Sequence, residues 1–261
     1  MSILTTPNFF YIDPVTTSNV NIDFKEPNVS ASQINAQLTA GSYTPSELIL
    51  ELQRVLNAFG TQTYTVTLNR STRLVSISSS DTFELLVSTG SASGTSIYST
   101  IGFTGSDRTG ASSYIGDSAI GNIYEPQFPL QNFQGFETRK EGIQTTVNES
   151  SSGEIEVISF GIRRIMSFTI TNITDRYKTP SNPIKNNSSG VQDALDFMDF
   201  ITDKNKLEFI KDKTNPSVFD KMILSSTQES EVGSGYTLKE LYSRGLLRFY
   251  ETGSLKFRKL S

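Results

Sequence analysis

The sequence contains no cysteine, no histidine and no tryptophan. Without cysteine the chain cannot form disulfides, zinc–thiolate sites or iron–sulfur clusters, and it has no thiol nucleophile. Without histidine it lacks the side chain most often used for proton transfer near pH 7, and with it the usual Ser-His-Asp arrangement. Carboxylates, lysine, tyrosine or a carboxylate-bound metal remain as possible catalytic groups. These absences favour a protein that is not an enzyme, and we expect no cofactor.

Basic clusters and long apolar runs are also scarce. The formal net charge is -4, and neither half of the chain has the basic excess that binding of duplex DNA requires, so we expect no nucleic-acid partner. The longest uncharged stretch, near residues 85–106, consists mainly of serine, threonine and glycine and is too polar to cross a bilayer. The first seven residues lack the basic start and apolar core of a secretory signal. We therefore expect no membrane insertion.

The clearest local signal is the start of a helix at residue 45. Thr44 fits the N-cap, Pro45 the first helical position and Glu47 the third, which together make a capping box. Gly60 is expected to end the helix in the left-handed conformation. An apolar face follows at helical spacing and consists of Leu48, Leu52, Val55, Leu56 and Phe59. The pattern predicts an amphipathic helix that packs on a sheet.

Short alternating segments around this helix indicate strands. Residues 63–68, 73–79 and 83–87 read as three antiparallel strands, with a turn at Asp81 and Thr82. Further strands are expected at residues 21–24 and 32–38, and residues 88–118 read as a long surface loop pinned at one apolar point. The sequence thus predicts an N-terminal α+β module over residues 1–124, in which one capped helix covers an antiparallel meander.

An extended connector is predicted over residues 125–153. Pro126 and Pro129 fix the backbone and remove hydrogen-bond donors, which excludes a regular helix or a central strand there. Residues 149–153 read as a flexible turn. A segment of this kind, with spaced apolar anchors, usually lies across its own domain or a neighbouring subunit. The candidate assembly contacts are Phe128, Leu130, Phe133 and Phe136.

Residues 154–261 read as a β-sandwich-like domain with one main helix, at about residues 190–203. Alternation over residues 162–173 places Met166, Phe168 and Ile170 on a core face. The chain as a whole is therefore predicted to be α+β, with two modules. The remaining elements expected in this domain are strands at 155–160, 207–210, 219–224, 246–250 and 255–260, and a short helix at 237–242.

Three polar features are candidates for chemistry. Asp193, Asp196, Asp199 and Asp203 lie near one face of the predicted helix, where like charges are more simply explained as the solvated side than as a metal site. Basic pairs occur at residues 139–140 and 163–164. They could bind an anion or an acidic neighbour, although edge-strand bases commonly prevent unwanted pairing. The glycines of residues 102–110 lack the lysine and the following helix of a phosphate loop.

Two groups of segments resemble known viral proteins. The first group resembles a module found in viral structural proteins and comprises residues 41–44, 56–58, 64–67, 74–77 and 101–103. The second resembles tail-associated proteins of tailed bacteriophages and comprises residues 129–133, 147–150, 157–161 and 207–210. The resemblance implies a bacteriophage virion structural protein of the tail, baseplate or neck. It includes no catalytic signature, so it assigns no site residue.

The expected function is thus a non-enzymatic one. We expect a structural protein that assembles as a ring or collar by protein-protein interaction, with copies of itself and other virion proteins as partners. Its location would be the virion, assembled in the host cytoplasm. The alternative is a carbohydrate-binding or adhesin module for host attachment, since a β-rich domain with exposed tyrosine and asparagine could bind sugars. A hydrolase that uses only carboxylates is a third possibility.

Overall fold

The structure is a computed structural model of the chain, and its fold is α+β. It divides into two compact units. The N-terminal unit comprises Phe9–Ile123 and Lys206–Phe219, and the C-terminal unit comprises Tyr124–Asn205, Asp220–Ser261 and the residues up to Asn8. The residues described are 7–126, 133–142, 145–149, 155–159, 162–174, 176–177, 185–186, 188–225, 239–244 and 247–260.

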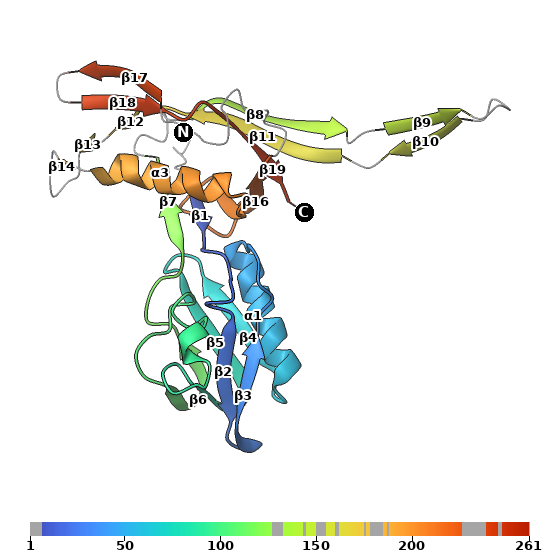
Figure 1. Ribbon diagram of the computed structural model, residues 1–261, viewed down its shortest axis with the longest axis vertical. Coiled ribbons are helices and arrows are strands. Elements are labelled where there is room, and N and C mark those ends of the chain that lie inside the picture. The colour runs from blue at the N-terminus through green and yellow to red at the C-terminus, as the bar shows by residue number, and fades with distance from the viewer. Residues whose placement is uncertain are drawn as a thin grey trace. The chain divides into compact units, whose positions relative to one another are not determined.

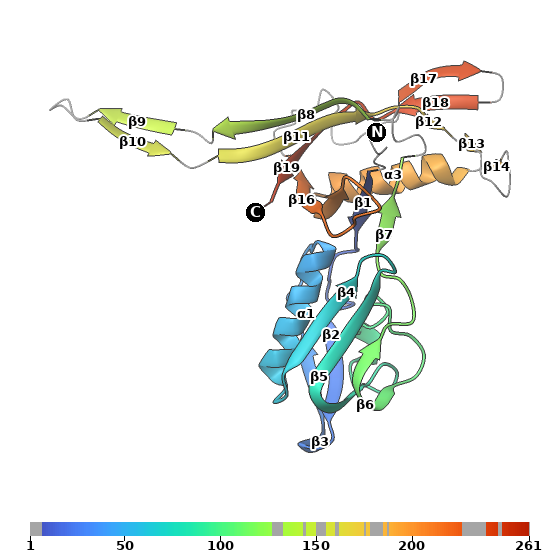
Figure 2. The same cartoon turned by 180° about the vertical axis from the view of Figure 1, so that it is seen from behind.

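The N-terminal unit is built on one antiparallel sheet of five strands. The sheet has the order β3-β2-β5-β4, and β6 also pairs with β5. The strands are β2 (Asn21–Glu26), β3 (Ser30–Gln37), β4 (Tyr64–Asn69), β5 (Leu74–Leu85) and β6 (Arg108–Ile115). Helix α1 (Pro45–Phe59) lies against β3 and β4, and β6 lies at the side of the sheet away from the helix, as both views show (Figures 1 and 2). The same unit also contains three further strands of order β7-β1-β15, apart from the terminal residues Asn8 and Tyr124. They are β7 (Asn122–Tyr124), β1 (Asn8–Tyr11) and β15 (Leu207–Ile210).

Helix α1 (Pro45–Phe59) confirms the predicted capping box. The Thr44 hydroxyl accepts the Glu47 N–H, and the Glu47 carboxylate accepts the Thr44 N–H. Leu48, Leu52, Val55 and Leu56 are buried, as predicted. Two details were wrong. Phe59 is 51% exposed, and Gly60 ends the helix with an extended backbone (φ -81°). Gly60 is required there for space, because a Cβ would lie 2.7 Å from a carboxylate oxygen of Glu26.

Strand β5 corrects the prediction of two short strands with a turn at Asp81 and Thr82. It runs unbroken from Leu74 to Leu85, and its partner on one side changes along its length. Its first half pairs with β4 and its last residues pair with β2. At the change of partner, the Gln62 side chain donates to the Thr82 carbonyl and accepts from the Ser79 hydroxyl. The polar residues of this segment therefore lie within a continuous strand, at the point where β5 changes its partner from β4 to β2, and do not form a turn.

The segment over residues 88–118 is not the surface loop that was predicted. It contains a short 3-10 helix (Ser93–Thr95) and strand β6. Its apolar residues Ile97, Tyr98, Ile101 and Phe103 all belong to the buried core of the unit. The Tyr98 hydroxyl donates to the Asp23 carbonyl at 2.5 Å. A few large side chains therefore hold a mainly polar segment in the core, which its composition alone does not indicate.

The C-terminal unit is β-rich and, in its described residues, contains one helix, α3 (Ser188–Thr202). Met166, Phe168 and Ile170 are buried, which confirms the predicted core face. The strands form a sheet of order β16-β19-β11-β8, a hairpin β9–β10, a sheet of order β12-β18-β17 and a pair β13–β14. Their bounds are β8 Phe133–Gly142, β9 Thr145–Glu149, β10 Ile155–Ser159, β11 Ile162–Ile170, β12 Ile173–Thr174, β13 Arg176–Tyr177, β14 Lys185–Asn186, β16 Phe219–Leu224, β17 Lys239–Arg244, β18 Leu247–Glu251 and β19 Ser254–Lys259.

Two other expectations for this half differ from the structure. Lys239–Arg244 forms strand β17, paired with β18, where residues 237–242 were expected to be a short helix. Cross-strand pairing thus overrides a weak helical pattern. Residues 154–261 were expected to form one domain, but Lys206–Phe219 belongs to the N-terminal unit.

Candidate assembly surfaces

The predicted assembly contacts lie around strand β8. Phe128 and Leu130 fall outside the described residues. Phe133 and Phe136 lie in β8, where Phe133 is opposite Ile170 of β11. This part of the expected connector is therefore a sheet strand. It is the last strand in the order β16-β19-β11-β8, so one of its edges is unpaired in the described sheet.

The unpaired edge of β8 is protected by charge and by an irregular backbone. Strand β8 contains a run of charged residues that only Thr138 interrupts: Glu137, Arg139, Lys140 and Glu141. A register shift lies between Ser167 and Thr169 of β11, and Gly135 of β8 has a positive φ of 61°. Charged side chains and bulges are the usual means by which natural sheets discourage pairing at an edge. The basic pair at residues 139–140 therefore fits the edge interpretation.

The second basic pair lies on β11, directly across from that strand. Arg163 is opposite Glu141, and Arg164 is opposite Lys140. Arg164 is exposed. Opposite charges directly across a strand pair stabilise it, and like charges destabilise it by a similar amount. Consecutive residues of a strand lie on opposite faces of the sheet, so the two pairs occupy different faces.

Strands β9 and β10 continue the β8–β11 hairpin. Gly142 is opposite Ile162, and three positions further on Thr145 is opposite Ser159 (Figure 1). In the described residues β9 and β10 pair only with each other. An isolated two-stranded hairpin is at best marginally stable in water, because it has no third strand and no sheet face to bury. We call β9 and β10 together the hairpin arm.

In the N-terminal unit, helix α1 covers the outer edge of β4. The Gln53 side chain accepts the Val66 N–H at 3.1 Å. The Asn57 side chain accepts the Tyr64 N–H at 2.8 Å and donates to the Tyr64 carbonyl at 2.9 Å. These amides occupy the backbone groups that an added strand would need. The edge of β4 is therefore closed over this stretch.

Strand β6 is protected in a different way. Two register shifts interrupt its pairing with β5, and Gly110 has a positive φ of 77°. The Tyr114 hydroxyl accepts the Ala111 N–H and donates to the Phe83 carbonyl. Irregular strands of this kind are poor templates for further pairing. The exposed Ile115 lies at the end of this strand.

Over most of its length, strand β3 lacks these protections in the described part of the chain, and its one register shift lies near its start. Its sequence, SASQINAQ, contains no charged residue and no proline. Among the described strands it pairs only with β2, and the register is regular from Asn21–Gln37 to Phe24–Ile34. Sequence reasoning identified the strand but not the open edge, since the order of strands in a sheet depends on contacts distant in sequence.

Glu26 and Glu208 are two of the buried carboxylates of the N-terminal unit, and both have structural partners. Glu26 accepts hydrogen bonds from the Thr61 and Gln62 N–H groups and from the Thr61 and Tyr64 hydroxyls. Burial alone would raise the pKa of Glu26, but the hydrogen bonds that it accepts outweigh burial and lower the pKa below its ordinary value of 4.5. Burial, reinforced by the same carboxylate, raises the pKa of Tyr64. This group anchors the segment between α1 and β4.

The second buried carboxylate, Glu208, holds the late segment Lys206–Phe219 onto the unit. It is completely buried, and it accepts the Ser46 N–H at 2.9 Å, in the first turn of α1. Arg70 pairs with it at 2.6 Å, and the Arg70 guanidinium lies 3.8 Å from the centre of the Phe219 ring. Lys206 pairs with Glu47 at 3.2 Å. A carboxylate at a helix N-terminus is favoured by the helix dipole.

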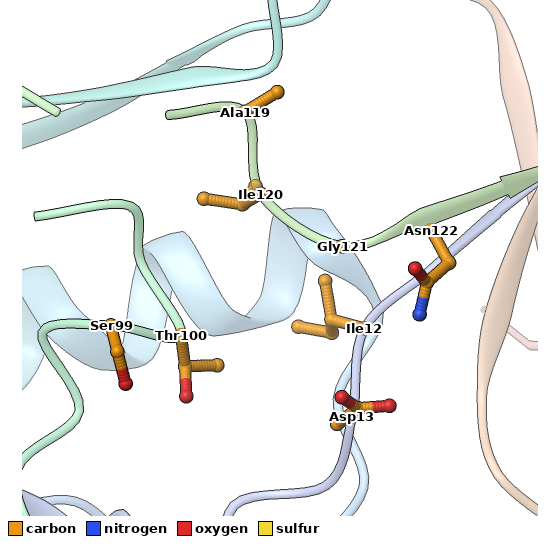
Figure 3. Close-up of a pocket in the computed structure, with 8 residues that line it drawn as sticks. All are labelled: Ile12, Asp13, Ser99, Thr100, Ala119, Ile120, Gly121 and Asn122. Carbon is orange, nitrogen blue, oxygen red and sulfur yellow. The ribbon is translucent and has the colours of Figure 1, made fainter. Parts of the chain in front are cut away.

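A small pocket lies on the N-terminal unit (Figure 3). Its volume is about 170 Å³, and its lining residues are Ile12, Asp13, Ser99, Thr100, Ala119, Ile120, Gly121 and Asn122. Gly121 has a positive φ of 60°, and a Cβ there would lie 2.6 Å from the Ile12 side chain. The lining contains one charged residue, Asp13, and no aromatic ring on which a sugar could stack. The pocket thus does not favour the adhesin alternative.

The acidic residues of α3 lie where the solvated-face interpretation places them. Asp196, Asp199 and Asp203 are exposed, and the side chain of Asp193 is outside the description. Within the described ranges, no group of three or more acidic residues is arranged to hold a metal ion. In the glycine-rich segment at residues 102–110, the Ser118 carbonyl oxygen lies so close to Gly102 that it leaves no room for a side chain. Close packing of the backbone therefore explains the glycine at this position.

Comparison with known proteins gives no assignment. No protein-family model matches the chain, and no curated protein sequence matches it. Among the described residues, no helix has the length and apolarity that crossing a bilayer requires.

Proposed function

We propose that this protein is a structural component of a tailed-bacteriophage virion, which assembles as a ring or collar of the tail, baseplate or neck. The observation that supports the proposal best is the hairpin arm, whose two strands have no third partner in the described chain. The segments that resemble phage tail-associated proteins include residues 147–150 and 157–161, which overlap the two strands of this arm, and residues 129–133, which end where β8 begins. The protein would act without catalysis, through contacts with its own copies and with other virion proteins.

The arm has a sequence suited to a protein contact. Val147 is directly opposite Val157, and both share a face with Ile155. Since no further described strand pairs with the arm, such a face would gain stability if another subunit buried it. Phe133 and Phe136 lie in β8, at the base of the same hairpin, and remain the proposed assembly contacts there.

Electron microscopy of negatively stained protein tests the assembly. We expect closed rings of the purified chain, alone or with the other virion proteins. The matched variant removes the arm and joins Gly142 to Ile162 through an Asn-Gly turn, which fits because these two residues are opposite each other. This variant should retain the circular dichroism of the parent and form no rings. Rings that persist without the arm would remove the observation on which the proposal rests.

The paired substitution Phe133→Ser and Phe136→Ser tests the base of the arm separately. We expect both units to stay folded by circular dichroism and the assembly to weaken in size-exclusion chromatography with light scattering. An unchanged assembly would mean that these side chains pack only within their own unit. Saturable binding of the purified protein to a glycan array, with no ring formed, would favour the adhesin alternative.

A further inference from the structure

The outer edge of β3 differs from the other long edges of the described sheets. The edge of β8 is charged, the edge of β6 is bulged, and the edge of β4 is covered by α1 side chains. Strand β17 carries Lys239, Glu240 and Arg244. Strand β3 has eight residues and no charge, no proline and only one register shift, near its start. An edge of this kind is a template for pairing with another strand.

The hydrogen-bond pattern identifies which groups of β3 are available. The Leu38 N–H donates to the Val20 carbonyl at 2.9 Å, so Leu38 faces β2. Backbone direction alternates along an antiparallel strand, and Ile34 and Ala36 therefore also face β2. The N–H and C=O groups of Gln33, Asn35 and Gln37 consequently point outward from the sheet.

The open stretch has a defined end. The next outward N–H, that of Thr39, donates to a Glu51 carboxylate oxygen at 3.0 Å. Glu51 is held in turn by Arg54, whose hydrogen bonds lower the pKa of this carboxyl to about 2. Helix α1 therefore closes the edge after Gln37. An added strand has room to pair along Gln33, Asn35 and Gln37.

We propose that this edge pairs with the β3 edge of a second copy of the chain, as antiparallel strands related by a two-fold axis through Asn35. In this register Gln33 is opposite Gln37 of the second copy, and each exchanges a pair of backbone hydrogen bonds with it. Ile34 is opposite Ala36 on the inner face, which continues the apolar face of the sheet across the axis. The proposal concerns a surface separate from the hairpin arm and holds whether or not the protein belongs to a virion.

The second copy is the favoured occupant because β3 is complementary to itself. A two-fold axis places each residue of β3 opposite another residue of β3, so a charged strand would bring like charges together. This strand has no charge to repel its copy. Asn35 and Gln33 are also already oriented within their own unit. The Asn35 amide donates to Asp23 at 2.5 Å, and the Gln33 amide donates to Ser91 at 2.6 Å. Their side chains therefore leave the edge clear.

Disulfide trapping in the full-length protein tests the register directly. Because the chain has no cysteine, each introduced thiol is unique. We expect a mixture of Gln33→Cys and Gln37→Cys proteins to form a disulfide-linked dimer under mild oxidation. Each variant alone should form far less, since neither cysteine is opposite itself in this register. Disulfides that form equally well in each variant alone, or in none, would overturn the proposal.

A pair of variants at Gln37 tests the backbone contact. Gln37→Pro removes an N–H that points outward from the sheet and has no hydrogen-bond acceptor among the described residues, a position at which sheets tolerate proline. It should weaken dimerisation about tenfold or more, measured by light scattering over a concentration series, because two symmetric hydrogen bonds are lost. Gln37→Ala keeps the N–H and should dimerise like the parent. A parent protein that stays monomeric at all concentrations, or a dimer that Gln37→Pro leaves unchanged, would contradict the proposal.

The outcomes also separate this proposal from the ring. Rings without the mixed disulfide would refute the β3 contact alone. The mixed disulfide without rings would refute the ring proposal alone.

Discussion

Removing the Glu208 carboxylate should strongly destabilise the N-terminal unit. Glu208 is completely buried, and Arg70 is only 13% exposed, so their pair at 2.6 Å is shielded from water. Breaking a buried ion pair by removing one partner costs about 3–5 kcal/mol, because the other charge is left buried without compensation. Glu208→Ala also leaves the Ser46 N–H without its acceptor. We therefore expect a loss near the upper end of that range.

The assay is urea unfolding of the full-length protein, followed by tyrosine fluorescence because the chain has no tryptophan. Lys206→Ala is the matched control in the same segment. Its partner is Glu47 at 3.2 Å, and the Lys206 side chain is 35% exposed, so its loss should cost about 0–1 kcal/mol. Arg70→Met should be destabilising alone. Combined with Glu208→Ala, it should cost less than the sum of the two single changes, because no charge is then left unpaired.

The result that would refute this reasoning is a Glu208→Ala protein whose unfolding free energy lies within about 0.5 kcal/mol of the parent, as for an ordinary surface substitution. The segment Lys206–Phe219 would then be held by its apolar contacts alone. Phe209 lies 5.1 Å from Phe9 between ring centres, and such contacts would persist in the variant.

Three further predictions concern stability and activity. Leu52→Ala should lower the unfolding free energy by about 2–5 kcal/mol, because it leaves a cavity on the buried face of α1. Thr44→Ala should lower it by about 1 kcal/mol, because the N-cap hydrogen bond is lost. An unchanged urea midpoint in Leu52→Ala would contradict the first expectation. The folded-state pKa of Glu26 is lowered, so its stabilisation is present above pH 4.5 and is lost as the pH falls through that lower pKa. The difference in urea midpoint between the parent and Glu26→Gln should therefore shrink towards pH 3, and a constant difference would contradict the assignment. Asp196→Asn and Asp199→Asn should fold and assemble like the parent. If the parent hydrolysed a common glycoside or phosphoester and either variant lost that activity, the non-enzymatic role would be contradicted.

The parts of the fold that the sequence predicts are those specified by nearby residues. The start of α1 depends on Thr44, Pro45 and Glu47, which lie within one helical turn, and the structure contains all of these contacts. The core face of β11 follows from alternation over a few residues. In both cases the interactions that stabilise the element are close in sequence, so a local pattern is sufficient.

The errors occur where contacts distant in sequence decide the structure. Asp81 and Thr82 have turn-forming character, yet β5 continues through them because Gln62 and the Asn28 side chain bind this stretch from other elements. Similarly, Tyr98 can be buried within a polar segment because its hydroxyl donates a hydrogen bond to the Asp23 carbonyl in β2. Neither partner is evident from local propensity. The Arg70–Glu208 pair likewise joins residues far apart in the chain.

The candidate surfaces differ from the core in how sequence specifies them. The aromatic residues Phe133 and Phe136 led to the prediction of an extended connector with assembly contacts. In the structure this segment is strand β8, which pairs with β11 and contains a run of charged residues. The uncharged edge of β3 has no conspicuous residue, and its significance comes from the protection present on β4, β6 and β8. An open edge is defined by what its neighbours cover, which a linear sequence does not display.

The hairpin arm is expected to contribute more to the proposed assembly than to the stability of a single copy. Ordering a backbone costs about 1–2 kcal/mol per residue, and cross-strand pairs return only about 0.2–1 kcal/mol each. Strands β9 and β10 pair only with each other in the described chain, so the facing Val147 and Val157 cannot offset that cost alone. Burial of this apolar face by another subunit would supply about 25 cal/mol for each Å² removed from water. It follows that deleting the arm should cost the isolated protein little stability and cost the assembly much more.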